Sequence, residues 1–328
     1  MMTISSSSLL EVKNLSIEFL HRKGNLQAIQ ALSLTMQPGE ILGMVGESGA
    51  GKSLTGSAIA GLLQSPGRIR QGEIWFNGQR IDNLNEEARR LLRGKAISCI
   101  FQDPLTSLNP VLTVGQQLIE TIRTHLPLSA REAEARAIAL LTEVGINSPE
   151  QRIHQYPHQL SGGMRQRVVI ALALCVDPQL VIADEPTTAL DVSVQAQVLS
   201  LLRRLCEQHG TAVMLITHDM GVVAEVCSRV AVMYAGRIVE TGPVAEVIRR
   251  PQHPYTRGLI SAIPSMRERR ENLTQIDGAM PRLNALPQGC AFNPRCPHAS
   301  VKCREQQPAI HPHHGVQLAC FHPQESPL

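Results

Sequence analysis

The stretch that decides the fold is Gly46-Glu47-Ser48-Gly49-Ala50-Gly51-Lys52-Ser53, which fits the pattern G-x-x-x-x-G-K-[ST]. An apolar run, Ile41 to Val45, precedes it, and Leu54 to Leu63 follows as a helix candidate. The glycines allow the backbone to curl until successive N–H groups point at a phosphate, and the helix adds the positive end of its dipole. We expect Lys52 to reach the β- and γ-phosphates of a nucleotide and the Ser53 hydroxyl to bind Mg²⁺. Taken alone, the same letters also fit a chance glycine-rich turn between a strand and a helix.

Strands and helices alternate on both sides of this loop. Apolar runs predict further strands at Val12–Phe19, Ala28–Met36, Gly72–Phe76, Ile97–Phe101, Leu180–Ala183 and Ala212–Ile216. Helices are expected at Ala130–Val144, Gly163–Val176 and Val194–His209, and a hairpin region at Gly236–Gly242. This alternation implies an α/β fold with a mainly parallel sheet that is covered on both faces.

Two departures from the alternation predict the domain organisation. Residues 103–160 are rich in helical patterns and read as a helical insertion. Beyond Pro264 the chain is rich in Pro, Cys, His and Arg with little periodicity. We therefore expect a nucleotide-binding domain over residues 1–264 and an irregular extension over residues 265–328.

The bulk composition excludes some classes of protein. The net charge of +3 over 328 residues is too mild for a nucleic-acid-binding protein, in which a clustered basic face is expected. A bilayer-spanning helix needs about 20 apolar residues, and the longest apolar run, Val168 to Val176, has nine. The serine-rich start, Met1 to Leu10, has no basic segment and does not resemble a secretory signal. We expect a cytosolic protein whose partners supply any membrane part.

Two adjacent acids close one of the apolar strands, at Asp184 and Glu185. Carboxylates at the end of a buried strand are costly unless they meet a cation. We expect Asp184 to bind Mg²⁺, directly or through water, as the second carboxylate of P-loop NTPases does. Glu185 points differently and is the candidate general base that takes a proton from the attacking water. An N-cap pair at a following loop is the alternative.

Two further polar residues follow strand ends. His218 comes after Ala212–Ile216 and Thr217, and a strand end of this kind faces the nucleotide crevice of an α/β sheet. It is expected to bind the γ-phosphate and orient the water. Gln102 ends Ile97–Phe101 and is a candidate Mg²⁺ and water ligand. A structural histidine and an ordinary loop glutamine are the alternatives.

A second candidate phosphate-binding helix start is Leu160-Ser161-Gly162-Gly163-Met164. One active site does not need two such loops. The economical explanation is that this loop completes a site on another subunit.

These motifs follow one another in a family-specific order: the phosphate loop, Gln102, the serine-glycine loop, Asp184-Glu185, Leu190-Asp191 and His218. In this order the chain resembles the ATP-binding cassette (ABC) family over about residues 10–262. The resemblance implies that two cassettes pair head to tail around two ATP molecules, with an antiparallel β part at the N-terminus. Ser161 and Gly163 are then expected to touch the γ-phosphate held by the partner's loop, and Asp191 to lie at the interface.

The same resemblance assigns the remaining nucleotide contacts and the coupling surface. Phe19 matches the aromatic position that stacks on adenine, where Tyr is common. Leu54, after the phosphate loop, completes the expected ATP contacts. Met164 replaces the usual Gln, which puts a side-chain contact there in doubt. Gln102 and residues 103–110 are expected to transmit closure to membrane subunits.

Two segments narrow the resemblance to the peptide importers: Phe101 to Pro110 and Tyr156 to Met164. His253-Pro254-Tyr255-Thr256 and the Cys-containing tail point the same way. The chain most resembles the D-type ATPase subunit of bacterial dipeptide systems. This implies a second ATPase subunit, two permeases, an extracytoplasmic binding protein and a place on the inner membrane. A D-alanyl-D-alanine system is the narrower expectation, and a nickel or other small-solute importer the alternative.

Eight cysteines fall into two groups. Cys99, Cys175, Cys206 and Cys227 lie singly in apolar segments and are expected to be buried small hydrophobes. The other four, with five, six and sixteen residues between them, lack the paired Cys-x₂-Cys spacing of zinc sites; they are Cys290, Cys296, Cys303 and Cys320. Four thiolates suit an iron–sulfur cluster, and members of the peptide-importer branch are similar in carrying a [4Fe-4S] cluster there. Zinc and unliganded thiols remain open.

Two other classes of protein fit the sequence less well. A soluble ABC ATPase acting on nucleic acid or ribosomes has two cassettes in one chain and basic arms, whereas this chain has one cassette and a mild charge. A nucleotide-gated scaffold without hydrolysis has no use for Glu185 and His218. An ATP hydrolase coupled to transport is therefore the leading hypothesis.

Overall fold

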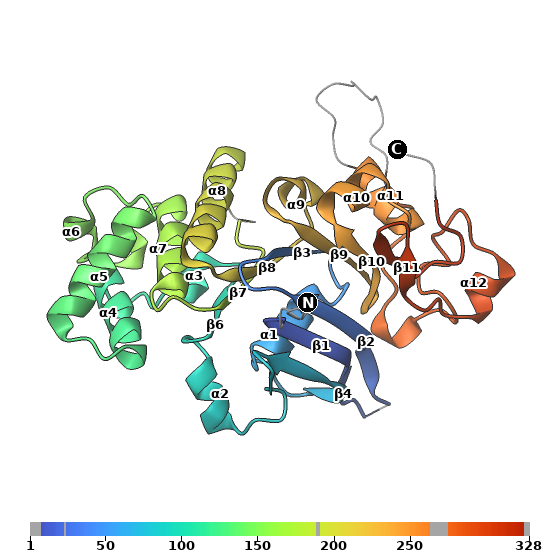
Figure 1. The fold of residues 1–328 in the computed structure, drawn as a ribbon, viewed down its shortest axis with the longest axis horizontal. Helices are drawn as coiled ribbons and strands as arrows, with labels where there is room; N and C mark the ends of the chain where they lie inside the picture. Colours follow the sequence, from blue (N-terminus) through green and yellow to red (C-terminus); the bar gives the residue numbers. More distant parts are fainter. Residues whose placement is uncertain (1–7, 23, 188–190, 263–274, 325–328) are drawn as a thin grey trace, which may run out of the picture. The chain divides into compact units, whose positions relative to one another are not determined.

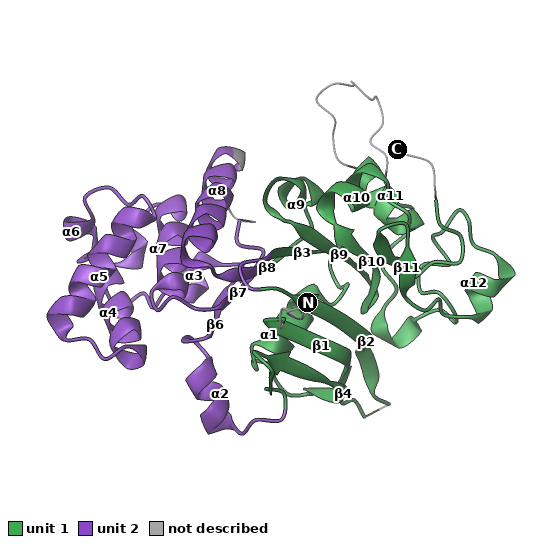
Figure 2. Cartoon of the chain, viewed as in Figure 1, with its two compact units in different colours: residues 1–37, 41–82, 215–328 green, residues 38–40, 83–214 purple. Residues whose placement is uncertain are grey.

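The computed structural model describes residues 8–22, 24–187, 191–262 and 275–324. The chain divides into two compact units, which Figure 2 colours separately. Unit 1 contains residues 1–37, 41–82 and 215–328, and unit 2 contains residues 38–40 and 83–214. The domain boundary expected at residue 264 lies outside the described residues, and the described residues on both sides of it belong to unit 1.

Unit 1 begins with an antiparallel sheet of four strands in the order β2-β1-β4-β5 (Figure 1). The strands are β1 (Leu10–Phe19), β2 (Leu26–Met36), β4 (Gly67–Phe76) and β5 (Gln79–Arg80). On β1, Ile17 stands opposite Ile29 of β2 and Ile69 of β4. The antiparallel N-terminal part implied by the family resemblance is confirmed.

The second sheet of unit 1 is built on the strand that leads into the phosphate loop. This strand, β3 (Ile41–Val45), is buried at every residue and pairs in parallel with β9 (Arg229–Tyr234). Next to β9 lies β10 (Arg237–Pro243), which forms the expected hairpin with it. The C-terminal extension continues the sheet, because β12 (Val316–Leu318) pairs with β10, and β11 (His311–His313) with β12. The extension is thus less irregular than its composition predicts.

Helices of unit 1 follow the strands and include α1 (Lys52–Ile59), α9 (Met220–Val226), α10 (Val244–Arg249), α11 (Pro254–Ser261), the 3₁₀ turn η2 (Leu283–Ala285) and α12 (Val301–Glu305). A cluster of buried aromatic rings joins α11 to the extension. In it, Tyr234, Tyr255 and Phe292 pack with ring centroids 4.7–5.4 Å apart. This aromatic cluster therefore packs the extension onto the rest of unit 1.

Unit 2 contains the parallel pair β6 (Ile97–Ile100) and β7 (Leu180–Asp184), together with helices. The helices are α2 (Glu86–Leu92), α3 (Pro104–Ser107), α4 (Val114–His125), α5 (Ala130–Glu143), α6 (Pro149–Arg152), the 3₁₀ turn η1 (Pro157–Gln159), α7 (Gly162–Leu174) and α8 (Val192–His209). Capping boxes start two of them, with Thr113 and Gln116 at α4 and Ser129 and Glu132 at α5. The helical insertion expected over residues 103–160 is present as α3 to η1. The boundary between the units falls within β8 (Ala212–Thr217).

Several element bounds differ from those that the pattern predicts. The helix after the phosphate loop ends at Ile59 instead of Leu63, because Gly61 takes a left-handed φ of 67° and the Leu62 N–H donates to Ser57 O. Strand β4 begins five residues earlier than predicted, at Gly67. Its polar first half lacks the apolar signal, but it pairs with β1 as far as Phe19.

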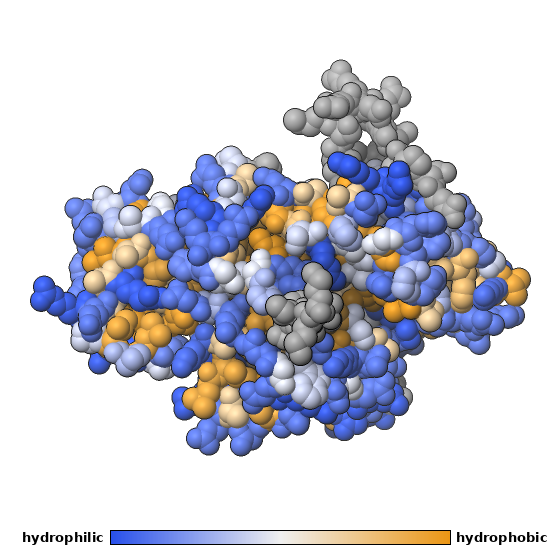
Figure 3. All heavy atoms as spheres, in the orientation of Figure 1, coloured by the Kyte–Doolittle hydropathy of each residue, from blue (hydrophilic) through white to orange (hydrophobic). Residues whose placement is uncertain are grey.

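On the face drawn in Figure 3, hydrophilic residues cover most of the area and apolar residues form separate patches. A membrane span would require a longer and more apolar helix than any that occurs in the described part of the chain.

Candidate functional site

The phosphate loop lies in unit 1 between β3 and α1, as its sequence predicts. The two glycines that the pattern requires both have positive φ, 152° at Gly46 and 102° at Gly51. A Cβ on Gly46 would stand 2.3 Å from Met233 O, and one on Gly51 would stand 2.5 Å from Ile29 Cδ1. Only glycine fits these positions, so the loop is packed tightly against its neighbouring strands.

Lys52 directs its ammonium back to the start of the loop. Its Nζ donates to Gly46 O at 2.7 Å and to Glu47 O at 3.1 Å, and the residue is only 5% exposed. No side chain caps α1 at Gly51, so the N–H groups of its first turn are directed towards the loop. A buried positive charge beside a helix N-terminus is an arrangement suited to a phosphate group. Ser53 lies exposed in that first turn, and Leu54 follows it half-buried.

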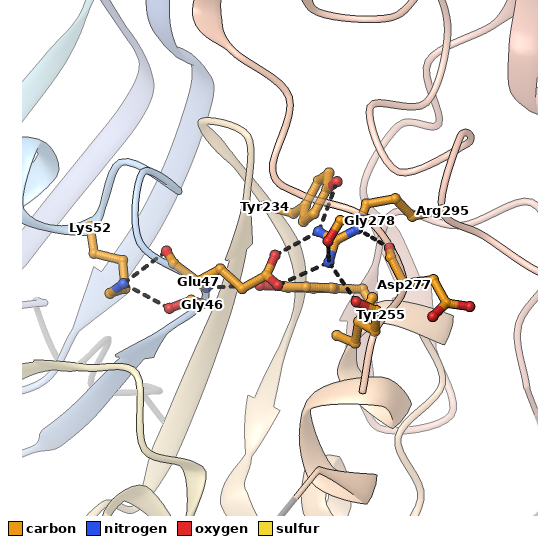
Figure 4. A network of polar contacts seen from close by, with 9 residues as sticks. Gly46, Glu47, Lys52, Tyr234, Tyr255, Asp277, Gly278 and Arg295 are labelled. Carbon is orange, nitrogen blue, oxygen red and sulfur yellow. Dashed lines mark hydrogen bonds and ion pairs between the residues drawn. The ribbon is translucent and has the colours of Figure 1, made fainter. Parts of the chain in front are cut away.

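Two residues from outside the loop, Tyr255 and Arg295, hold Glu47 in place (Figure 4). The sequence did not predict these contacts. The Glu47 N–H donates to the Tyr255 hydroxyl oxygen at 2.9 Å. Its carboxylate accepts two bonds from the Arg295 guanidinium, at 2.7 and 3.0 Å. These bonds to Glu47 raise the pKa of Arg295, and burial raises the pKa of the Tyr255 hydroxyl. The only hint in the sequence was Tyr255, which belongs to a family-specific segment but had no assigned role.

In unit 2, the ends of two paired strands bring the expected hydrolytic residues together. Gln102 follows β6, and Glu185 follows β7 next to Asp184. The Gln102 Nε2 donates to Glu185 Oε2 at 3.0 Å. Glu185 has a left-handed φ of 46°, which is uncommon for a residue with a side chain and turns its carboxylate away from the strand direction. Burial, followed by the charge of Asp184, raises the pKa of the nearby Cys99 thiol to about 11.

The serine-glycine loop forms the start of α7, as expected. Ser161 is the N-cap, and its hydroxyl accepts from the Met164 N–H at 3.3 Å. A hydroxyl that accepts in this way still has a proton to donate. Gly162 has open space around its Cα, and a Cβ on Gly163 would stand 3.0 Å from Val194. Leu160 is buried beneath the loop. The exposed Ser161 and the bare backbone after it leave room for an anion from outside unit 2.

The remaining predicted residues lie at element ends. His218 follows β8 and is exposed, in unit 1. Asp191 caps α8, accepting from Val194 N at 2.9 Å, and that backbone hydrogen bond lowers the pKa of its carboxyl. Leu190 lies outside the described residues. Phe19 ends β1, half-buried, opposite Leu26 and Gly67.

The predicted site residues therefore form two sets. Unit 1 contains the phosphate loop, Phe19 and His218, and unit 2 contains Gln102, Asp184, Glu185 and the serine-glycine loop. Within each unit the structure confirms the strand ends and helix starts on which these residues were expected.

The four C-terminal cysteines line one pocket in unit 1. Rings of His253, Phe292 and Phe321 line it with them. Burial raises the pKa of the Cys290 thiol, and the nearby Cys303 and Cys296 raise it further. The Cys290 N–H donates to Cys303 O at 2.8 Å, so a backbone hydrogen bond joins the two ends of the segment from Cys290 to Cys303. Among the described residues, no three His, Cys, Asp or Glu side chains are grouped closely enough to hold a single metal ion.

The other four cysteines are inert small side chains, as expected. Cys175 and Cys206 are buried, and Cys99 and Cys227 are largely covered. Burial raises the pKa of Cys175, Cys206 and Cys227 to about 12, which keeps these thiols protonated and unreactive.

Two family models match the chain. Residues 29–188 match the model described as "ABC transporter". Residues 239–303 match the model "Oligopeptide/dipeptide transporter, C-terminal region". The second match covers most of the hairpin strand β10, all of α11 and three of the four clustered cysteines.

Curated relatives are similar to this chain over nearly its whole length. The dipeptide transport ATP-binding protein DppD of Escherichia coli is 45% identical over 317 residues, 96% of this chain and 97% of that protein. The oligopeptide transport ATP-binding protein OppD of Salmonella typhimurium is 48% identical over 320 residues, 98% of this chain and 95% of that protein.

Solved structures give the same fold. The dimeric ATP-binding cassette MJ0796, in a post-hydrolysis state with ADP and Pi, is 26% identical with a TM-score of 0.65, over 72% of this chain and 98% of that one. The cbiO1 protein of Clostridium perfringens, part of an ABC transporter complex, is 28% identical with a TM-score of 0.63, over 73% of this chain and 90% of that one. With these likenesses and the motifs in their expected places, the chain belongs to the ABC transporter family, among the ATP-binding subunits that include DppD and OppD.

Proposed function

We propose that this chain hydrolyses ATP to energise the import of di- and oligopeptides through a bacterial inner-membrane transporter. The observation that carries the proposal is the whole-length similarity, 45–48%, to ATP-binding proteins of dipeptide and oligopeptide transport. The C-terminal match to a region typical of peptide transporters supports the same cargo class. A place on the cytoplasmic face of the membrane, bound to permeases, follows from this function.

Each residue of the two sets has a part in hydrolysis. Lys52 and the N–H groups of the phosphate loop bind the phosphates of ATP, and Phe19 stacks on the adenine. Ser53, Asp184 and Gln102 supply oxygen ligands for Mg²⁺, which would neutralise phosphate charge when bound. Glu185 takes a proton from the attacking water, and the hydrogen bond from Gln102 orients its carboxylate. His218 orients the water and the γ-phosphate.

The serine-glycine loop acts on a second ATPase subunit. Ser161 and the bare backbone of Gly162 and Gly163 form a helix start that is exposed on unit 2. A triphosphate held by a partner's phosphate loop fits such a positive helix end. Asp191, exposed at the start of α8, belongs to the same interface. ATP thereby draws the two subunits together, and hydrolysis lets them part. The partner is a different ATPase subunit, as the D-type resemblance implies.

The coupling surface for the permeases is the region of Gln102 and residues 103–110. Two exposed apolar side chains, Phe101 and Val111, flank this region in the sequence. A third, Tyr156, lies on the same unit. Val111 is the most exposed of the three, at 74%. A permease that covers these side chains would bury apolar surface and receive the motion of unit 2. An extracytoplasmic binding protein supplies the cargo to the permeases.

The cysteine pocket suits a [4Fe-4S] cluster held by Cys290, Cys296, Cys303 and Cys320. Four thiols around one largely apolar pocket are the donor set that such clusters use. A four-iron cluster is larger than one ion, so its ligands need not be grouped as for zinc. The cluster would act structurally, by linking the Cys290–Cys303 turn to Cys320.

The cluster is tested by anaerobic purification with iron analysis and visible absorbance. Cys303→Ser should remove both iron and colour, whereas Cys206→Ser, in a buried site outside the pocket, should keep both. Zinc in place of iron, or a metal-free protein that keeps its fold, would contradict the cluster.

The function itself is tested by assembling the chain with its second ATPase, the two permeases and the binding protein in lipid vesicles. ATP-dependent uptake of peptides, abolished by Lys52→Ala, is the expected result. Uptake of Ni²⁺ without peptides would assign the chain to a metal importer of the same branch. The D-alanyl-D-alanine dipeptide is the narrower cargo prediction, to be compared with L,L-dipeptides in the same assay.

A further inference from the structure

One arginine of the C-terminal extension reaches the phosphate loop. Arg295 Nη1 and Nη2 donate to the two carboxylate oxygens of Glu47, at 2.7 and 3.0 Å (Figure 4). The two residues are 248 positions apart in the sequence. A bidentate pair of this kind fixes both the distance and the orientation of the two side chains. The extension is thus tied to the second residue of the loop.

The same guanidinium is anchored in the extension. Its Nε donates to Asp277 O at 2.7 Å, and its Nη2 also lies 3.2 Å from Ile276 O. Its Nη1 lies 3.4 Å from the Tyr234 hydroxyl oxygen. The Arg295 side chain is 5% exposed, against 31% for Glu47. A planar group that is buried and bonded on several sides cannot follow the loop, so the loop has to conform to it.

Glu47 is also fixed through its main chain. Its N–H donates to the Tyr255 hydroxyl, and its carbonyl accepts from Lys52 Nζ and from the Ala50 N–H. The N–H groups that would bind phosphate belong to the residues immediately after it. Holding residue 47 by its side chain and by both main-chain groups therefore fixes the direction of those N–H groups before a nucleotide arrives.

We propose that Arg295 is a positioning residue for ATP, through which the C-terminal extension sets the nucleotide affinity of the phosphate loop. This rests on the proposed binding of ATP by that loop. When the Arg295–Glu47 pair is broken, Glu47 is released. ATP then has to order the phosphate loop as it binds, which costs binding free energy. Arg295 itself acts only through Glu47. Its turn also carries Cys290 and Cys296, so the packing of the cysteine pocket holds the arginine in place.

The test is the affinity of the full chain for ATP, measured by displacement of a fluorescent ATP analogue. Arg295→Gln should weaken ATP binding about tenfold, within the usual range of coupling between sites. In the assembled transporter it should raise KM for ATP by a similar factor and leave kcat within about twofold. Arg295→Lys should recover part of the affinity, because one charged bond remains. The matched control is Arg80→Gln, which removes an arginine paired with Glu73 and Asp82 elsewhere in unit 1 and should leave ATP affinity unchanged.

A double-mutant cycle separates positioning from general destabilisation. If Arg295 acts through Glu47, then Glu47→Gln alone and the double variant Glu47→Gln with Arg295→Gln should weaken binding equally. Additive losses, or an unchanged affinity in Arg295→Gln, would overturn the inference. If Arg295→Gln does not fold, the ATP affinity of Glu47→Gln, which leaves the extension intact, is measured in its place. A Glu47→Gln chain that binds ATP as tightly as the wild type would then overturn the inference. A wild-type chain that does not bind ATP would instead count against the proposed function.

Discussion

The backbone conformation of Glu185, the proposed general base, and the contact with its neighbour Gln102 together orient its carboxylate. Its φ of 46° departs from the strand that precedes it, at a cost of order 1–2 kcal/mol for a residue with a Cβ. The Gln102 amide donates to one carboxylate oxygen and fixes the direction of the side chain. A strained backbone conformation that sits beside a candidate nucleophile-activating group is typical of functional sites.

Replacing Glu185 with Gln should remove hydrolysis and keep ATP binding. The amide of the new side chain cannot take a proton from water, but its oxygen can still accept from Gln102. We expect kcat to fall by about 10²- to 10⁴-fold, the usual contribution of a general base, with the ATP dissociation constant unchanged. Phosphate release by the assembled transporter measures the first, and analogue displacement the second.

The control for this change is Glu207→Gln, which breaks an exposed ion pair with Arg203 on α8 and should leave kcat unaffected. Undiminished ATPase activity in the Glu185 variant would remove this residue from the mechanism and leave Asp184 as the remaining carboxylate.

At this scale the sequence predicted the positions of the candidate site residues well, because each belongs to a short motif. Lys52, Ser53, Ser161 and Glu185 all lie on the strand ends and helix starts expected for them. Arg295 could not be predicted, since nothing local marks an arginine that pairs with a residue 248 positions earlier. Contacts between distant segments depend on the folded chain, and a single sequence contains no pattern for them.

At the scale of elements, helix α11 depends on an unusual cap. His253 is its N-cap, and the imidazole Nδ1 accepts from the Tyr255 N–H at 3.1 Å. The ring is buried against Phe292, with centroids 5.8 Å apart. Burial lowers the pKa of His253 from 6.5 to about 3. The helix that carries Tyr255 to the phosphate loop is therefore capped only by the neutral form of histidine.

Acid should destabilise the protein through this cap. Below pH 6.5 the unfolded chain binds a proton at His253 that the folded chain refuses, so stability is present above that pH and is lost as the pH falls towards 3. Between pH 6.5 and pH 5 the loss is about 2 kcal/mol at most, at about 1.4 kcal/mol for each pH unit. Urea denaturation at the two pH values measures it.

His253→Asn is the matched variant, because asparagine accepts at an N-cap but does not titrate. Its absolute stability will be lower owing to the lost ring, so the comparison is between slopes with pH. Equal slopes in the variant and the wild type would show that His253 is not the group responsible.

Element bounds were less predictable than element types. Strand β4 was predicted only from Gly72, because its first half is polar and alternation alone does not reveal an edge pairing with β1. The extension looked irregular by composition, yet β12 adds to β10 through backbone bonds that any residue type except proline can make. The helical insertion was predicted correctly, since its amphipathic pattern and capping boxes are local signals.

At the scale of the whole molecule, the proposed pairing of two ATPase subunits assigns the two loops of this chain to different nucleotides. Unit 1 carries the phosphate loop, and unit 2 carries the serine-glycine loop that we assign to a partner's nucleotide. Each subunit of a head-to-tail pair then contributes one loop of each kind to two different sites. Damage to one loop should affect one site only.

This division predicts the number of nucleotides bound by the paired ATPase subunits. Lys52→Ala should remove the ATP held by this chain's own phosphate loop, and Ser161→Asp should remove the one held by the partner's loop. The aspartate still caps α7, but it places a negative charge where a γ-phosphate is expected. Each single variant of the pair should bind about one ATP in place of two, and the double variant none. Ser161→Asn is the control for charge, since it also caps the helix without adding charge, and it should weaken nucleotide binding less than Ser161→Asp does. Equilibrium dialysis with labelled ATP counts the sites, and a Ser161→Asp pair that still binds both nucleotides would mean that the serine-glycine loop does not face the partner's phosphates.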